Sequence, residues 1–414
     1  MKIARSSRLK ALTLGLMLAL LPFAAGTSSA RIQEPSKPTV QETTLNGTAT
    51  SVVATTSGAK TEGKPVSGPA GTFTAFALNK NTLPQLMAVG PDGAIYYAQA
   101  GSNRIGQIAV PAAADSGKIT IRDFPIPTAE SFPEGITVAP DGTVWFTEQN
   151  AHSIGRLDPE KGEITEYRTP TPNSGPVGIA VGPDNRIWFT EAYANKIGVL
   201  DPSAPEKMEE FAIPTPVSTP LYIVSGPDGG LWFAGVRSHK LGRIDPTTHV
   251  FAEYTLPTPK AGPTSLVVGP DAAIWVSEFG VDKIARFDVK ARKFTDEVLI
   301  NSRKNGPRSG PGMLVNGPDG NIWFTEMFGN QIGALNPTTK QVIEFSAPAL
   351  LANDSTVPKS GDSAAQAKFD ANINLGGGQT LAPTSGPGGI AFSQDGTLWY
   401  TAIYGNGVAR LKLK

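Results

Sequence analysis

The sequence predicts an all-β fold, a seven-bladed β-propeller with four-stranded blades, and three observations predict it. A short module with one central aromatic residue occurs seven times in the 414-residue chain. Glycine and proline are abundant, with 45 and 36 residues, which indicates many turns between short elements rather than long helices. A strand pattern at residues 72–78 precedes the first module, has no partner there, and can complete the last blade.

The repeated module is clearest at residues 317–326, which read Gly-Pro-Asp-Gly-Asn-Ile-Trp-Phe-Thr-Glu. Its central aromatic residues are Tyr96, Trp145, Trp188, Trp232, Trp275, Trp323 and Trp399. Successive aromatic residues lie 43 to 49 positions apart, except for a last step of 76. A period of about 40–50 residues built from short strands is typical of propeller blades.

Each repeat divides into four predicted strands. In one repeat, strands at 178–181 and 187–190 flank a Pro-Asp-Asn turn, and a third strand follows at 196–200. An Asp-Pro turn and a fourth strand come next, and a Pro-Thr-Pro connection then enters the next repeat. The last repeat lacks a fourth strand, so the strand at 72–78 is expected to take that place and close the ring without an open sheet edge.

The predicted domain organisation is a signal peptide at 1–30, a disordered linker at 31–70, and the propeller at 71–414 with a long insert at 346–386. A basic start, an apolar run at 11–25 and small residues at 28–30 indicate export. We therefore expect a secreted or periplasmic monomer with no membrane span after signal cleavage. The chain has no cysteine, which excludes disulfides and thiol catalysis, and its zero formal charge gives no indication of nucleic acid binding.

Acidic residues end the second strand of four repeats. These residues are Glu148, Glu191, Glu278 and Glu326, and the other repeats have Gln99, Gly235 and Ala402 there. Oxygen ligands of this kind bind hard cations, so the four glutamates are candidate ligands for Mg²⁺ or Ca²⁺. The alternative is that each glutamate accepts hydrogen bonds from its neighbouring loop.

Glu134 is a candidate general base. It begins the first strand of the second repeat, in Pro-Glu-Gly-Ile, on the face that also carries the ends of the second strands. The alternative is a solvated side chain. His152 and His239 are predicted to be turn residues, because other repeats have asparagine or aspartate in the same position.

The chain resembles the virginiamycin B lyase, or streptogramin lyase, family. The resemblance rests on the 317–326 module, on Ser-Ile-Gly-Arg-Leu-Asp-Pro at 153–159, and on Glu-Tyr followed by Pro-Thr-Pro, and it covers residues 72–414. It implies a seven-bladed propeller and a carbon–oxygen lyase that opens cyclic depsipeptides by elimination with Mg²⁺. It also implies a catalytic histidine in a Pro-His-Gly-Ile motif, whereas the matching positions here hold Glu134, Val177 and Gly388.

Two functions follow from the sequence. The first is a metal-assisted lyase or hydrolase that acts on a cyclic ester or lactone. The second is a non-catalytic propeller that binds a peptide, glycan or protein partner. In both cases a small-molecule or peptide ligand is expected on the face that carries the loops between second and third strands and the connections between blades.

Overall fold

The computed structural model describes residues 39–57, 66–79, 81–110, 117–300, 309–348 and 386–413. All of them belong to one compact unit, which comprises residues 37–353 and 384–414. The predicted signal peptide, the first part of the predicted linker and nearly all of the predicted insert lie outside the described residues. Within the described residues, no helix is long and apolar enough to cross a membrane.

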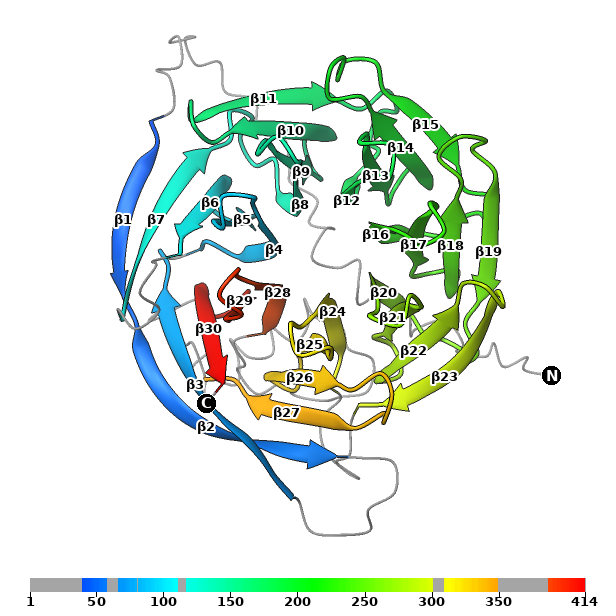
Figure 1. Ribbon diagram of the computed structural model, residues 1–414. Coiled ribbons are helices and arrows are strands. Elements are labelled where there is room, and N and C mark those ends of the chain that lie inside the picture. Colours follow the sequence, from blue (N-terminus) through cyan, green and yellow to red (C-terminus); the bar gives the residue numbers. More distant parts are fainter. Residues whose placement is uncertain are drawn as a thin grey trace, which may run out of the picture. The chain divides into compact units, whose positions relative to one another are not determined.

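The described residues form seven four-stranded antiparallel blades arranged in a ring, which confirms the predicted propeller (Figure 1). Blades 1 to 4 consist of β4 (Pro84–Val89), β5 (Ile95–Gln99), β6 (Arg104–Ala109) and β7 (Lys118–Pro125); β8 (Pro133–Val138), β9 (Val144–Glu148), β10 (Ser153–Asp158) and β11 (Glu163–Arg168); β12 (Pro176–Val181), β13 (Ile187–Glu191), β14 (Lys196–Leu200) and β15 (Glu209–Ala212); and β16 (Pro220–Ser225), β17 (Leu231–Gly235), β18 (Lys240–Ile244) and β19 (Phe251–Thr255). Blades 5 to 7 consist of β20 (Pro263–Val268), β21 (Ile274–Glu278), β22 (Lys283–Asp288) and β23 (Lys293–Leu299); β24 (Pro311–Asn316), β25 (Ile322–Glu326), β26 (Gln331–Leu335) and β27 (Val342–Ser346); and β28 (Pro387–Phe392), β29 (Leu398–Ala402), β30 (Gly407–Leu413) and β3 (Val66–Ala77). The first strand of each blade contacts the first strand of the next, and β28 contacts β4, so the ring is closed.

The closing strand is the one that the sequence predicts. β3 pairs antiparallel with β30, with Phe73 opposite Leu411 and Phe76 opposite Val408. Both phenylalanines are fully buried, and Phe76 stacks on Trp399 with ring centroids 6.1 Å apart. Residues distant in sequence therefore complete blade 7 through backbone hydrogen bonds and a shared core.

The structure differs from the predicted linker at residues 41–57 and 66–70, which form strands. β1 (Gln41–Asn46) adds a fifth strand to the outer edge of β7, and β2 (Thr48–Ser57) pairs with both β27 and β3. The segment is rich in threonine and valine, whose branched side chains favour strands once an edge is available for pairing. The sequence pattern missed these strands because they have few large apolar residues and depend on the outer edges of blades 6, 7 and 1.

The repeated module is explained by burial and by one hydrogen bond. All six tryptophans are at most 2% exposed and pack between blades. In blades 3 to 6 the aspartate of the turn accepts a hydrogen bond from the indole nitrogen, as between Trp232 and Asp228 at 2.9 Å. In blades 2 and 7 a hydroxyl accepts it, from Trp145 to Thr143 at 3.1 Å and from Trp399 to Ser393 at 3.2 Å. The buried indole N–H is thus satisfied within its own blade.

The position that precedes the third strand confirms the predicted turn role of two histidines. It has a left-handed backbone in all seven blades, with φ between 45° and 58° at Asn103, His152, Asn195, His239, Asp282, Asn330 and Asn406. Several of these side chains also accept a backbone N–H from the start of the next blade, as His152 Nδ1 does from Gly175 at 3.3 Å. His152 and His239 therefore connect neighbouring blades.

Candidate active site at the inner rim

The loops between second and third strands meet the connections between blades on one face, which we call the loop face. The backbone shows this in six blades, because the residue after the second strand donates to the residue before the first strand, and in blade 5 Gly280 N donates to Ala261 O at 2.8 Å. Examples are Ala192 N to Gly175 O at 2.9 Å and Ile403 N to Gly386 O at 3.0 Å. The predicted grouping of these loops is confirmed.

Each first strand begins on the loop face with a proline followed by a β-bulge. The register against the second strand shifts directly after this proline in all seven blades. Proline fits this first position because it has no N–H to pair, and a bulge redirects the side chains that follow. We call the seven bulged starts the inner rim.

A hydroxyl from the second strand holds most of these bulges. Thr147 Oγ1 accepts the Gly135 N–H at 2.9 Å and donates to Val177 O of blade 3 at 2.8 Å. Glycine is required at position 135, because a Cβ there would lie 2.1 Å from Val177 O. The threonine of the repeated module therefore links neighbouring first strands around the inner rim.

The bulge of blade 2 carries Glu134, which is half-buried. Tyr222, on the bulge of blade 4, donates its hydroxyl to Glu134 Oε1 at 3.3 Å. Burial raises the pKa of Glu134 to about 7, and the Tyr222 hydrogen bond opposes that rise. A carboxyl group with this pKa can accept a proton at neutral pH.

Tyr222 of blade 4 contacts Glu134, and Tyr193 of blade 3 packs against the same small cluster as Tyr222. Burial and then the charge of Glu134 raise the pKa of Tyr193 to about 12, and the same causes place the pKa of Tyr222 well above its usual range. Both hydroxyls thus stay protonated at neutral pH. Sequence reasoning missed both residues, although Tyr222 stands where Gly135 and Gly178 stand in blades 2 and 3, a departure from the repeat that marks the position.

The four glutamates that end the second strands lie on four separate blades and are at most 1% exposed. Three of them face a glutamate on the fourth strand of their own blade. Burial, then the nearby glutamate of the fourth strand, raises the pKa of Glu148 to about 9, of Glu191 to about 8 and of Glu278 to about 8. Glu326 instead accepts the Ser309 hydroxyl at 2.6 Å.

This arrangement does not fit one metal ion held by all four glutamates. Among the described residues, no group of three or more histidine, cysteine, aspartate or glutamate side chains is placed to hold a metal. The side-chain hydrogen bond that the structure gives Glu134 is with Tyr222. The structure therefore brings Glu134 together with two tyrosines and leaves the four glutamates in separate blade interiors.

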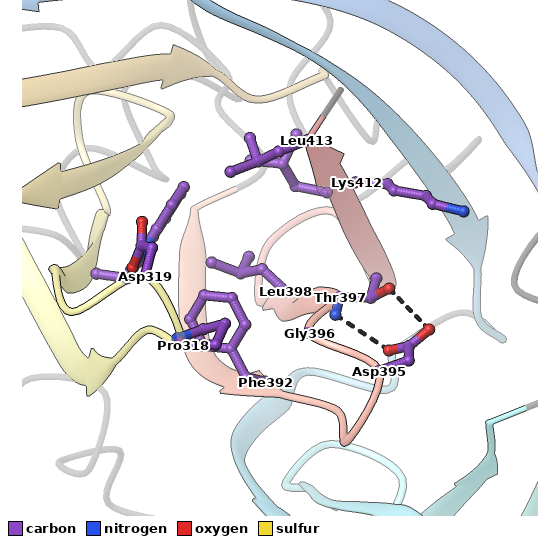
Figure 2. Close-up of a pocket in the computed structure, with 11 residues that line it drawn as sticks. Pro318, Asp319, Phe392, Asp395, Gly396, Thr397, Leu398, Lys412 and Leu413 are labelled. Carbon is purple, nitrogen blue, oxygen red and sulfur yellow. Dashed lines mark hydrogen bonds between the residues drawn. The ribbon is translucent and has the colours of Figure 1, made fainter.

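A pocket of about 430 Å³ lies on the opposite face, between blades 6 and 7. Figure 2 shows Asp319, Phe392, Asp395 and Lys412 around it, with Asp395 bonded to its own turn at Thr397. None of the predicted site residues lines this pocket. The predicted site residues and this pocket therefore lie on different faces of the propeller.

Comparison with known proteins gives one family. The family model described as the virginiamycin B lyase family matches residues 33–287 and 202–349. No curated protein matches the chain. A hydrazine synthase from Kuenenia stuttgartiensis shares the fold, with 17% identity and a TM-score of 0.56 over 85% of this chain and 98% of that chain.

Three solved structures are similar over most of their length. A streptogramin B lyase has 29% identity and a TM-score of 0.66, over 83% of this chain and 97% of that chain. Virginiamycin B lyase from Staphylococcus aureus has 28% identity and a TM-score of 0.65, over 91% and 100%. A catalytically inactive variant of the Staphylococcus aureus enzyme with quinupristin, in which alanine replaces a histidine, has 29% identity and a TM-score of 0.66, over 83% and 99%.

Proposed function

Because the chain belongs to the virginiamycin B lyase family, we propose that it is a lyase that opens an ester-containing ring at the inner rim, with Glu134 as the general base. The observation that carries this proposal is the contact of Glu134 with Tyr222, in a half-buried position where the pKa of the carboxyl is about 7. A base of this pKa is well matched to neutral pH.

The proposed reaction is an elimination. Glu134 takes the proton from the carbon next to a carbonyl group, and a carbon–carbon double bond forms as the neighbouring carbon–oxygen bond of the ester breaks. The ester oxygen leaves as a carboxylate, so no water is consumed. Tyr193 is the nearby hydroxyl that donates a hydrogen bond to the negative charge on the carbonyl oxygen.

The family resemblance implies Mg²⁺, and the described residues do not form a shared site for it. No step of the proposal passes through a metal. The experiment below therefore compares turnover with and without Mg²⁺. Export, which the first 30 residues predict, is part of the proposal and would bring the enzyme into contact with extracellular depsipeptides.

The second candidate function is ligand binding without turnover. The observation in its favour is the position of the histidines, since His152 and His239 serve as turn residues and His249 stacks on Phe211 with ring centroids 4.0 Å apart. No histidine stands at an inner-rim position in any blade. The inactive relative carries alanine in place of a histidine, so a family member without that residue can keep its ligand and lose its chemistry.

One experiment separates the two functions. The purified protein is incubated with quinupristin and with simple lactones, with and without Mg²⁺, and the products are followed by chromatography and mass spectrometry. Elimination opens the ring without a change of mass, whereas hydrolysis adds one water. Unchanged substrates that bind in calorimetry establish the binding function, and turnover that is intact in Glu134→Gln rules out the proposed base.

A further inference from the structure

In blades 3 to 6, the aspartate in the turn between first and second strands accepts the indole N–H of its own blade's tryptophan. In three of these blades an arginine also pairs with the aspartate. The ion pairs are Asp184–Arg186 at 2.7 Å, Asp228–Arg243 at 2.6 Å and Asp271–Arg286 at 2.7 Å. Among the described residues, Asp319 of blade 6 pairs with no lysine or arginine, and its donors are Asn321 and Trp323.

Blade 6 lacks the arginine at both positions that supply it elsewhere. In blades 4 and 5 the arginine lies on the third strand, opposite the tryptophan in the register, whereas Ala334 lies opposite Trp323. In blade 3 the arginine stands two residues after the turn aspartate, and Asn321 has that position in blade 6. The Asn321 side chain donates to Asp319 Oδ2 at 2.8 Å, but it brings no positive charge.

The pocket of about 430 Å³ between blades 6 and 7 lies beside this aspartate. Figure 2 shows Asp319 on the blade 6 side and Phe392, Leu398 and Leu413 on the blade 7 side. Small-molecule sites commonly have volumes of about 300–1,000 Å³ and combine an apolar lining with a few polar groups. The pocket therefore offers one ligand both a carboxylate and an apolar wall.

The corresponding place between blades 3 and 4 is filled by the protein itself. Arg186 extends across to blade 4 and donates to Pro246 O at 2.9 Å, with its guanidinium carbon 5.2 Å from the Trp188 ring centroid. Pro246 belongs to the turn between the third and fourth strands of blade 4, and the register places Leu413 at the matching position of blade 7. In blade 7 these two strands, β30 and β3, come from distant parts of the sequence. The pocket thus corresponds to the space that an arginine and a turn occupy between blades 3 and 4.

Two other charged residues line the pocket, Asp395 and Lys412. Asp395 accepts hydrogen bonds within its own turn, from the Ser393 hydroxyl at 2.6 Å and the Thr397 N–H at 3.0 Å. The Lys412 side chain extends away from Asp319 (Figure 2). The lining residues therefore carry two carboxylates and one ammonium group, which leaves a negative charge for a cation to neutralise.

We propose that the pocket between blades 6 and 7 binds a small organic cation, a guanidinium group on an apolar stem. The guanidinium group takes the place that Arg186 has in blade 3, where it pairs with Asp319 and lies against Trp323, while the stem packs on Phe392 and Leu413. A guanidinium group suits this place because it is planar, weakly hydrated, pairs with carboxylates and stacks on aromatic rings. The site lies on the face opposite the inner rim and is independent of the proposed lyase reaction.

The test uses n-butylguanidinium with the full chain, followed by calorimetry and by thermal unfolding at constant ionic strength. For a ligand of this size a Kd of about 1 mM is expected. At about ten times that concentration, Tm is expected to rise by about 2 °C. Guanidinium chloride, which lacks the stem, is expected to bind at least about tenfold more weakly, and butyrate, which carries a negative charge on a similar stem, is not expected to bind. No binding of butylguanidinium, or equal binding of either control compound, overturns the proposal.

Matched variants locate the site. Asp319→Asn removes the charge, keeps an oxygen atom for the Trp323 indole, and is expected to weaken binding at least about tenfold. Asp141→Asn changes the turn aspartate of blade 2 and is the control, expected to bind as the parent does. Asn321→Arg supplies the arginine of blade 3 and is expected to abolish butylguanidinium binding, while Tm without ligand stays at or above that of the parent. Unchanged binding in either Asp319→Asn or Asn321→Arg overturns the site.

Discussion

The hydroxyl of Tyr222 lies 3.3 Å from Oε1 of Glu134, although the two residues belong to blades 4 and 2. Both stand on β-bulges at the start of a first strand. Tyr222 occupies the position that holds glycine in blades 2 and 3. The contact holds a half-buried carboxyl group beside a protonated phenol. It is the feature from which the first two predictions derive.

The first prediction concerns the pH dependence of turnover. Because the Glu134 carboxyl has a pKa of about 7 and acts as the base, kcat/KM is expected to rise about tenfold per pH unit below pH 7 and to level off above it. Glu134→Gln is expected to lower kcat/KM by about 100-fold or more. Glu160→Gln, on an exposed turn, is the matched control and is expected to retain full activity. A flat profile between pH 5 and 8 would contradict the assignment.

The second prediction concerns Tyr222→Phe. The Tyr222 hydrogen bond favours the charged form of Glu134, so its removal is expected to raise the pKa of Glu134 and move the pH profile upward. At pH 7 the variant is expected to lose activity that it recovers at higher pH. Tyr167→Phe, on the outer strand of blade 2, serves as the control. A uniform loss of activity at every pH would indicate that Tyr222 is only structural.

The third prediction concerns stability and the buried acid of blade 3. Burial and Glu210 raise the pKa of Glu191 from 4.5 to about 8. The stabilisation from its bound proton is therefore complete below about pH 4.5 and is lost as pH rises toward 8, by roughly 1 kcal/mol per pH unit. Glu191→Gln keeps the neutral form at all pH values and is expected to flatten this decline. Urea unfolding of the parent and of the variant between pH 5 and 9 measures how the free energy of unfolding declines with pH. If the two proteins decline in parallel, Glu191 is not protonated in the folded state.

The fourth prediction concerns the hydroxyls of the inner rim. Thr190 Oγ1 accepts the Gly178 N–H at 2.8 Å and donates to Leu221 O at 2.5 Å. Thr190→Val keeps the shape and leaves both buried backbone groups unpaired, so the free energy of unfolding is expected to fall by about 2 kcal/mol. The same change at the exposed Thr165 is expected to cost less than about 0.5 kcal/mol. Equal losses of unfolding free energy at the two positions would show that the rim hydroxyls stabilise the fold no more than an exposed hydroxyl does.

The sequence alone determined the number of blades, the four-strand repeat and the closing strand. These features follow from local patterns that recur at a fixed period, because no blade can bury its own faces and every copy must present the same aromatic residue to its neighbour. The turn role of His152 and His239 was predictable for the same reason, since asparagine and aspartate fill the equivalent position.

Only the tertiary structure decided which side chains meet. The repeat places Glu148, Glu191, Glu278 and Glu326 at equivalent positions, and equivalence around a ring sets them on separate blades. The first three face a glutamate of their own fourth strand, and Glu326 accepts the Ser309 hydroxyl. Glu134 and Tyr222 meet because bulges redirect them, and a bulge's side-chain direction is not encoded in strand alternation. β1 and β2 form on edges that exist only once the ring has closed, so their own residues gave too weak a signal to predict them.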